Sequence, residues 1–221
     1  MTGAFITATH TGIGKTFFTA AWTRYLRAHG TPALALKPIA CGDRADAETF
    51  APANDHQLPL NLINPIHLTP PLSPYAACIV EDKPFDWDPW HRALAHLRAH
   101  FPGPFLIEGV GGWLVPITRT YFIRDFAADL ALPIVLVTST ALGTLNHTLL
   151  TVESIRASRL PLLGIVANPY NVPDDLASAT NPALLEDLCQ LPVWTLPSNL
   201  ESATWPPWLH LSSLGSLSTL R

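Results

Sequence analysis

The 221-residue chain has few charged residues and no concentration of positive charge. Lysine and arginine total 13 against 17 aspartate and glutamate residues, so the formal net charge is −4 and the isoelectric point is about 6.1. A polyanion such as nucleic acid is held by clustered lysine and arginine side chains. The sequence therefore predicts no nucleic-acid partner, although it leaves room for small anionic ligands.

Cysteine is also scarce. Cys41, Cys78 and Cys189 are odd in number and have no C-x-x-C spacing, so the sequence predicts neither a disulfide framework nor a zinc site. The N-terminus lacks the basic segment and long apolar run of a secretory signal peptide. We therefore expect a protein of the reducing cytoplasm.

Membrane-spanning character is absent as well. Residues 130–152 contain no Lys, Arg, Asp or Glu, and such a run can indicate a membrane span. However, Pro133, Asn146 and several hydroxyl residues interrupt it. It divides better into a buried strand and the start of a helix, so we expect no membrane segment.

Short apolar runs alternate with segments of helical or loop character along the chain. This rhythm predicts an α/β fold: a mostly parallel sheet with helices on both faces. The length suits a single domain over residues 1–221. The predicted strands are residues 4–7, 33–36, 105–107, 134–137, 162–166 and 193–196, and the predicted helices are residues 15–29, 45–52, 73–80, 89–100, 146–158 and 181–189. The tail at residues 210–221 is rich in Ser and Leu and carries no motif that can be interpreted.

The first predicted strand leads into a phosphate-binding motif, Thr9-His10-Thr11-Gly12-Ile13-Gly14-Lys15-Thr16. A phosphate loop needs backbone N–H groups that face one concavity, a lysine that reaches the β- and γ-phosphates, and a hydroxyl on Mg²⁺. Gly12 and Gly14 permit the tight backbone, Lys15 supplies the charge and Thr16 supplies the hydroxyl. Thr9 replaces the first glycine of the usual pattern. A chance Gly-Lys-Thr is the alternative, but the order strand, loop, helix favours a P-loop NTPase-like site.

Two charged residues end other predicted strands, where ligands of open α/β sheets bind. Glu108 is a candidate Mg²⁺ ligand, because this hard cation prefers carboxylate oxygen; the alternative is a solvated strand-end carboxylate. Lys37 is a candidate charge clamp on a transferred group; the alternative is a lysine whose ammonium reaches solvent. Asp43, Asp46 and Glu48 are all candidates for a second metal carboxylate, and the residues alone do not choose among them.

Three further features bear on ligands. Residues 141–147 follow a strand and open a helix, so their N–H groups can hold a carboxylate; a simple N-cap by Thr144 or Asn146 is the alternative. Asn168 can hydrogen-bond a base edge or serve as a satisfied turn asparagine. The nine histidines show no metal-ligand spacing, but His10 stands out because it lies inside the phosphate loop.

Together these motifs resemble the dethiobiotin synthetase family over roughly residues 4–168. The order and spacing of five motifs carry the resemblance: Thr9-x-Thr11-x-x-Gly14-Lys15-Thr16, Lys37-Pro38-x-x-x-Gly42, Ser73-Pro74, Glu108-Gly109-x-Gly111-Gly112 and Leu142-Gly143-x-x-Asn146-His147. The resemblance implies a homodimeric P-loop ligase of biotin biosynthesis with shared active sites. It would convert 7,8-diaminononanoate, CO₂ and ATP, with Mg²⁺, into dethiobiotin, ADP and phosphate.

The resemblance also implies a role for each site residue. The ATP site would comprise Thr11, Gly12, Ile13, Gly14, Lys15, Thr16, Glu108 and Asn168, with Asn168 reading adenine. Thr16, Asp46 and Glu108 would hold Mg²⁺. Lys15, Lys37 and Thr11 would act in catalysis, with Lys37 stabilising the substrate carbamate and the phosphoryl group. The substrate would meet Lys37, Cys41 and Gly111, and its carboxylate would meet Gly143, Thr144, Leu145 and Asn146 of the neighbouring subunit.

Four residues depart from the family pattern. Ala8 stands where a glycine is usual, His10 and Gly12 stand where acidic residues are usual, and Cys41 stands where a serine is common. The residues of the ATP machinery are unaffected, whereas two carboxylates and a hydroxyl near the substrate are missing. We therefore expect weaker binding of the diamine. The segment of residues 43–72 is also shorter than is usual in this family.

Two alternatives to this activity remain at this point. One is a related P-loop ligase that acts on another amine. The other is a nucleotide-switch ATPase of the partition type. Proteins of that type usually carry a lysine three residues before Gly14, where this chain has Thr11, and this difference argues against the switch.

Overall fold

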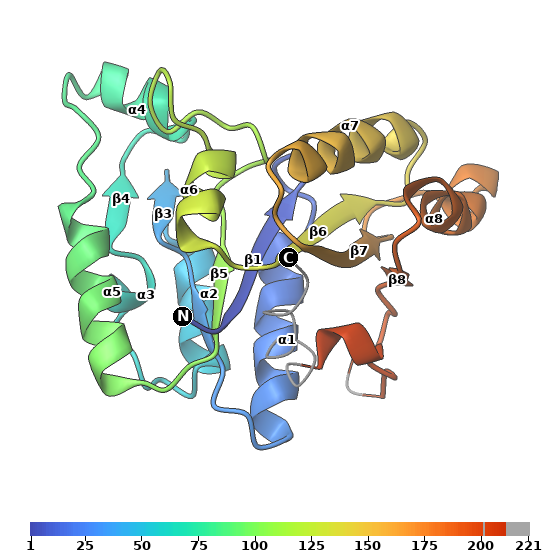
Figure 1. The fold of residues 1–221 in the computed structure, drawn as a ribbon, viewed down its shortest axis with the longest axis horizontal. Coiled ribbons are helices and arrows are strands. Elements are labelled where there is room, and N and C mark those ends of the chain that lie inside the picture. The colour runs from blue at the N-terminus through green and yellow to red at the C-terminus, as the bar shows by residue number, and fades with distance from the viewer. Residues whose placement is uncertain (201, 211–221) are drawn as a thin grey trace.

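The computed structural model describes residues 1–200 and 202–210, and their main feature is a six-stranded sheet (Figure 1). The strand order is β2-β5-β1-β6-β7-β8, and every neighbouring pair is parallel. The strands are β1 (Gly3–Ala8), β2 (Leu34–Leu36), β5 (Phe105–Glu108), β6 (Ile134–Ser139), β7 (Leu162–Asn168) and β8 (Val193–Thr195). The predicted α/β fold with a parallel sheet is confirmed. All six predicted strands are present, with ends shifted by one or two residues.

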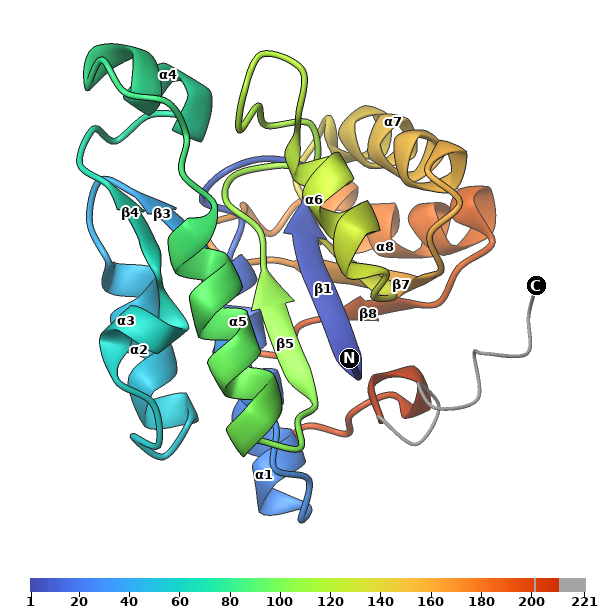
Figure 2. The same ribbon diagram turned by 60° about the vertical axis from the view of Figure 1, so that its left-hand side comes forward.

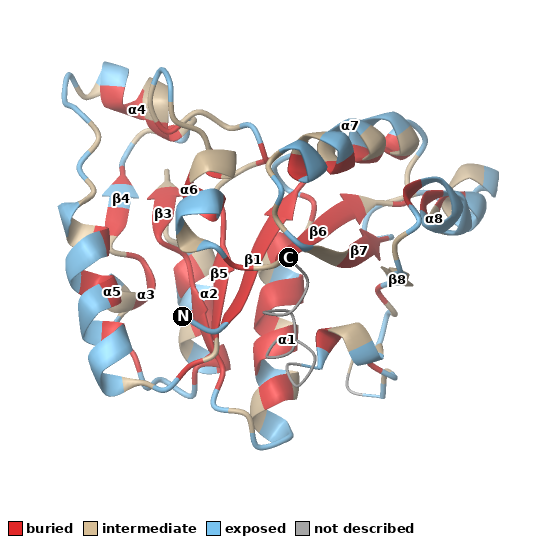
Figure 3. Cartoon of the chain, in the orientation of Figure 1, coloured by how far each residue is buried: buried red, intermediate tan, exposed pale blue. Residues whose placement is uncertain are grey.

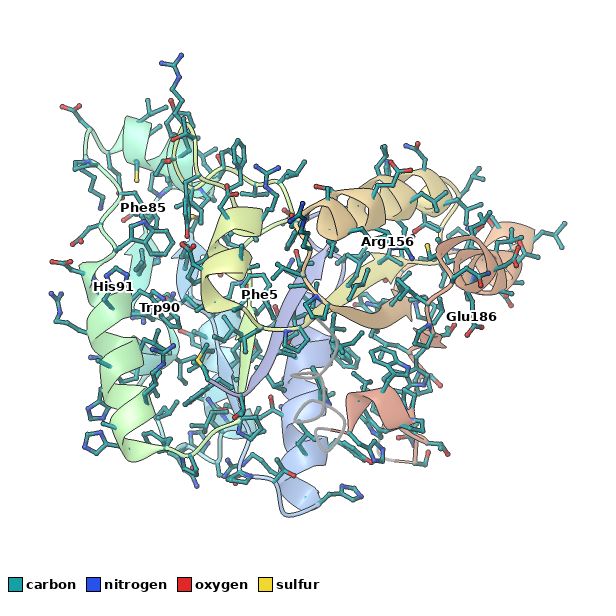
Figure 4. All side chains as sticks on the ribbon, in the orientation of Figure 1. Phe5, Phe85, Trp90, His91, Arg156 and Glu186 are labelled. Atoms are coloured by element: carbon teal, nitrogen blue, oxygen red, sulfur yellow. The ribbon has the colours of Figure 1, made fainter. Side chains whose placement is uncertain are left out.

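Helices cover both faces of this sheet (Figure 2). Along β1, Phe5 packs in one apolar cluster with Phe126 and Trp90, whereas Ile6 packs in a second cluster with Phe18. Phe5 and Trp90 are labelled in Figure 4, and Figure 3 shows that the central strands are buried. The helices are α1 (Lys15–Ala28), α2 (Ala45–Ala53), α3 (Leu60–Ile63), α4 (Pro74–Val80), α5 (Asp88–His100), α6 (Ile123–Leu130), α7 (Thr144–Ala157) and α8 (Leu176–Cys189), with a 3₁₀ turn η1 (Pro207–Leu209) near the end.

A second, two-stranded sheet was not predicted. It pairs β3 (Ile39–Cys41) with β4 (Ile66–Leu68) in parallel. Each strand has only three residues, which is too short for a periodic pattern to stand out. The Asn64 side chain joins this sheet to the main one, because its Nδ2 donates to the carbonyl of Lys37 and to that of Ile66, both at 2.9 Å. The small sheet therefore fixes the backbone at the end of β2.

Several helix predictions need correction. Helix α8 begins at Leu176 and not at residue 181, because Asp175 caps it: Oδ1 of Asp175 accepts from the Ser178 N–H at 2.8 Å. The helix contains Pro182 in its interior. Helix α7 begins two residues earlier than expected, and α3 and α6 were not predicted.

Within the described residues, no helix is long and apolar enough to cross a membrane. The interruption of residues 130–152 that was expected from the sequence is present, since β6 and α7 divide that stretch. Of the tail at residues 210–221, only His210 is among the described residues.

Candidate active site

The carboxyl ends of β2 and β5 and the first turns of α1 and α2 bring four polar side chains into contact. Nζ of Lys37 lies 2.5 Å from Oε1 of Glu108 and 2.6 Å from Oδ2 of Asp46. The Thr16 hydroxyl lies 2.7 Å from Oδ1 of Asp46 and 3.0 Å from Oε1 of Glu108, within donating distance of both. Lys37 and Glu108 are buried, with 3% and 1% of their surfaces exposed. Four residues that are distant in the sequence thus meet at one edge of the sheet, where the strand ends predicted Lys37 and Glu108 to lie.

Opposite charges in this cluster keep Lys37 and Asp46 in their charged forms. Burial lowers the pKa of Lys37, but the carboxylates of Glu108 and Asp46 raise it by more, so Lys37 remains a cation. Burial raises the pKa of Asp46, and Lys37 lowers it by more. For Lys15, burial is the largest influence and lowers the pKa to about 8, because attraction by Glu108 is offset in part by repulsion from Lys37. An anionic phosphate beside Lys15 would favour its charged form.

The oxygen atoms of the cluster suit a divalent cation. Oε2 of Glu108 is buried and has no hydrogen-bond partner among residues 1–200 and 202–210. A buried carboxylate oxygen without a partner is unfavourable, and a cation beside it would remove the penalty. Two carboxylates and a hydroxyl fit Mg²⁺, which prefers oxygen ligands and keeps several waters. The described residues contain no group of three or more His, Cys, Asp or Glu side chains that could hold a metal ion.

The structure also distinguishes the three acidic residues left open by the sequence. Asp46 contacts Lys37 and Thr16, whereas Asp43 and Glu48 are exposed. Asp46 occupies the first turn of α2, and Asp43 accepts from the Ala45 N–H just before that helix, at 3.1 Å. Position on the helix therefore selects Asp46 as the second carboxylate of the cluster.

The phosphate loop connects β1 to α1 through Gly14, which has a left-handed φ of 91°. A Cβ at Gly14 would lie 2.2 Å from Nδ2 of Asn168, so the loop needs glycine there for space as well as for conformation. Nδ2 of Asn168 donates to the Ile13 carbonyl at 2.9 Å and so holds the loop. No described side chain caps α1, and the N–H groups of its first turn suit an anion. That Asn168 reads adenine stays a prediction.

Helix α7 begins beside the phosphate loop. Its N-cap is Gly143, with a φ of 93°, and no described side chain caps the helix. The Thr144 hydroxyl is buried: it donates to the Ser139 carbonyl at 2.8 Å and lies 2.9 Å from the hydroxyl of Thr138. Asn146 is exposed. The simple N-cap by Thr144 or Asn146 is therefore not what the structure shows, and the first N–H groups of α7 suit a carboxylate as those of α1 suit a phosphate.

A cavity of about 480 Å³ lies between the phosphate loop and α7. Thr9, His10 and Thr11 line it from the loop, and His147 lines it from α7. Gly111 adjoins it, since a Cβ at Gly111 would lie 3.4 Å from the Thr11 hydroxyl oxygen. The cavity has a size suited to a small molecule, and it opens next to the phosphate site.

Cys41 lies at the end of β3, where it packs against the cluster of Leu68, Ala77 and Cys78. Burial raises the pKa of its thiol to about 11. The group is thus a neutral thiol at physiological pH, and thiols are weak hydrogen-bond donors. Its contact with a substrate stays a prediction.

Comparison with known proteins identifies the family. A family model described as an AAA domain matches residues 2–201. The ATP-dependent dethiobiotin synthetase BioD of Akkermansia muciniphila is 38% identical over 193 residues, which cover 87% of this chain and 90% of that protein. The corresponding proteins of Thermodesulfovibrio yellowstonii and of an Anaeromyxobacter strain are 37% and 36% identical, and the matches cover 85% and 97% of their lengths. This chain belongs to the dethiobiotin synthetase family.

Solved structures extend this likeness beyond the dethiobiotin synthetase family only at the level of fold. Chloroplast FtsY of Physcomitrella patens has a TM-score of 0.58 at 14% identity, with 96% of this chain and 65% of that one covered. The septum site-determining protein MinD of Pyrococcus horikoshii, complexed with Mg-ADP, has a TM-score of 0.53 at 17% identity, with 100% and 98% covered. Identities this low show a shared P-loop fold, so they lend no support to a nucleotide switch.

The sequence did not predict the residues that fix the backbone next to this dethiobiotin synthetase-type site. Asn64 binds the Lys37 carbonyl, and Arg44 donates to Oδ1 of Asn64 at 2.9 Å. Nδ2 of Asn181 donates to the carbonyls of Thr140 and Ala141, at 2.8 and 3.0 Å, and fixes the segment that leads to α7. No local signal marks Asn64 or Asn181, because their partners come from other parts of the chain.

Proposed function

We propose that this protein synthesises dethiobiotin from 7,8-diaminononanoate and CO₂ and converts ATP into ADP and phosphate in the process. The proposal rests on the position of Lys37, a buried cation at the end of β2 that forms ion pairs with Glu108 and Asp46. It lies beside a phosphate loop whose own lysine is also buried. Relatives that share 36 to 38% of its residues are named ATP-dependent dethiobiotin synthetases.

The arrangement fits transfer of a phosphoryl group to a carbamate. A carbamate oxygen attacks the γ-phosphorus, ADP leaves, and the second amine then attacks the carbamate carbon, closes the ring and expels phosphate. Lys15 and Lys37 stabilise the negative charge that moves between these oxygens. The chemistry depends on positioning and charge stabilisation, and both lysines are held by buried contacts.

We include Mg²⁺ in the proposal, held by Thr16, Asp46 and Glu108. When bound, this ion would neutralise charge on the phosphates of ATP. The unpartnered oxygen of Glu108 supports its presence. Thr11 and the backbone of residues 12–14 complete the ATP site in this proposal.

We also propose that each chain is a single domain, that two chains form a homodimer, and that the protein acts in the cytoplasm. Residues 143–146 of one subunit would bind the substrate carboxylate of its neighbour through the first N–H groups of α7. Three large apolar side chains around this helix are exposed, namely Leu114, Leu142 and Leu150, by 51%, 86% and 58%. A neighbouring subunit that covers these leucines would bury apolar surface.

The experiment combines purified protein with MgATP, bicarbonate and 7,8-diaminononanoate, and mass spectrometry then measures the cyclic urea. We expect dethiobiotin, and none from a Lys37→Gln control. ATP hydrolysis that does not depend on the diamine, with no dethiobiotin, would favour the nucleotide switch. A cyclic urea formed from a different diamine, with 7,8-diaminononanoate inert, would favour the related ligase.

A further inference from the structure

His10 is the residue of the phosphate loop that the proposed chemistry has not used. It is exposed, and it lines the cavity of about 480 Å³ together with His147, whose ring centroid lies 6.1 Å away. Among the described residues that line this cavity, the two histidines alone have ionisable side chains. The other lining residues are hydroxyl-bearing, apolar or glycine. The cavity beside the phosphate site therefore holds a single kind of group that can take up a proton near neutral pH.

The surroundings of His10 keep its imidazole uncharged. Burial is the largest influence that lowers its pKa, and repulsion from His147 and Lys15 lowers it further. Nδ1 of His10 lies 3.1 Å from the hydroxyl oxygen of Thr9. In the tautomer in which Nδ1 donates to Thr9, the lone pair on Nε2 is available to accept a proton.

The proposed reaction requires a proton acceptor for the substrate amine. An aliphatic amine with a pKa near that of lysine, about 10.4, is an ammonium ion at neutral pH and has no lone pair with which to attack CO₂. Lys15 and Lys37 would repel such an ion next to the phosphate site. The two nearby carboxylates, Asp46 and Glu108, already contact Lys37 and Thr16.

We propose that His10 accepts the proton of the substrate ammonium group before that nitrogen attacks CO₂, an inference that rests on the proposed function. The ammonium transfers one proton to Nε2, which leaves a neutral amine and an imidazolium. The amine lone pair forms the N–C bond, one C=O electron pair moves to oxygen, and the second proton on nitrogen leaves to water. Because His10 is exposed, the imidazolium returns its proton to solvent.

The test is the pH profile of kcat/KM for the diamine in His10→Gln and in the unchanged protein. Without the acceptor, the variant depends on the small fraction of free amine. We expect a loss of about 10³-fold near pH 7 and recovery to within about 3-fold near pH 10. The acid limb of the profile therefore moves to higher pH. The KM for ATP stays unchanged, since Lys15 and Thr16 are untouched. His10→Asp supplies a different acceptor and should restore activity near pH 7.

Two histidine variants serve as controls. His147→Gln removes a neighbouring imidazole that lowers the pKa of His10, so the acid limb should move to higher pH while the rate at high pH stays the same. His96→Gln alters an exposed histidine on α5, far from the loop in sequence, and should leave the profile unchanged. The ring centroid of His96 lies 4.1 Å from that of His100 on the same helix.

An equal loss at every pH in His10→Gln would indicate a structural role, and an unchanged profile would show that another group takes the proton. Either result overturns the proposed role of His10 and leaves the proposed function standing, because the unsubstituted protein still makes dethiobiotin. If the unchanged protein makes none at any pH, the proposed function is wrong and the role of His10 falls with it.

Discussion

Glu108 connects the two halves of the candidate site. One of its oxygens lies against Lys37 and Thr16, and the other is buried without a partner among the described residues. A side chain in this position can bind a metal ion and a lysine at the same time. Glutamine in place of Glu108 would keep the shape of the side chain and remove its negative charge. Substitution of Glu108 is therefore the sharpest test of the proposed metal site.

Glu108→Gln should raise the Mg²⁺ concentration needed for half-maximal rate and reduce turnover by about 10²-fold or more, because metal charge stabilises the transferred phosphoryl group. The measurement is the initial rate against Mg²⁺ concentration. Glu48→Gln is the matched control, since this exposed glutamate on α2 was an alternative ligand by sequence alone. An unchanged Mg²⁺ dependence in Glu108→Gln would remove Glu108 from the metal site.

Cys41 supplies the second residue-scale prediction. Cys41→Ser replaces a weak donor by a stronger one, and one hydrogen bond of about 1 kcal/mol lowers the KM for the diamine by roughly 5-fold. Steady-state kinetics at about pH 8 should show this change with the KM for ATP unaltered. Because burial raises the pKa of the thiol to about 11, the advantage of serine should not vary between about pH 6 and pH 9. An increased KM for the diamine would indicate that the thiol suits a different substrate.

Residues with a local signature, and the sheet edge at which they gather, could be predicted. Contacts made by residues without such a signature could not. The glycines and the lysine of the phosphate loop form a motif that can be recognised from the sequence, and so does Glu108 with the glycines that follow it. The choice of Asp46 over its neighbours needed the folded position of α2. Asn64 and Asn181 have no sequence signature, because each binds carbonyls that only the fold brings near.

At the scale of elements, the same reasoning separates what was predicted from what was not. Every strand of the main sheet was found from its apolar run. The central strands β1, β5 and β6 are apolar at nearly every position because they are covered on both faces. The strands β3 and β4 were too short to be recognised. Helix α8 was predicted to begin at residue 181, whereas the capping box at Asp175 sets its start at Leu176.

The start of α7 gives the element-scale prediction. Gly143→Ala places a side chain at a φ of 93°, which destabilises the fold by about 1 to 2 kcal/mol and disturbs the first turn of α7. The KM for the diamine should rise, while the KM for ATP should not. Gly30→Ala is the control: its φ is 81°, and at both positions a Cβ would meet no described atom within 4 Å.

Both variants should lower the midpoint of thermal unfolding by a similar amount. Only Gly143→Ala should affect the diamine, because Gly30 follows the far end of α1. Equal kinetics in the two variants would mean that the start of α7 does not bind the substrate.

At the scale of the whole molecule, the proposed dimer makes each active site depend on two chains. Lys15→Ala would inactivate the phosphate loop, and Asn146→Glu would place a negative charge where the substrate carboxylate binds. Each variant alone should be inactive. In an equal mixture, half of the dimers are mixed and each contains one intact site, so activity should return to about a quarter of the normal value. Activity that does not return, together with a monomer in sedimentation analysis, would contradict the shared site.

The central claim is that this site uses ATP to join CO₂ to a diamine. The most direct measurement supplies ¹³C-labelled bicarbonate with 7,8-diaminononanoate and MgATP, and follows labelled dethiobiotin and ADP in the same reaction. We expect the label to enter the carbonyl of the cyclic urea, and ADP and dethiobiotin to form in equal amounts. ADP released at the same rate without the diamine, with no labelled product, would contradict the central claim.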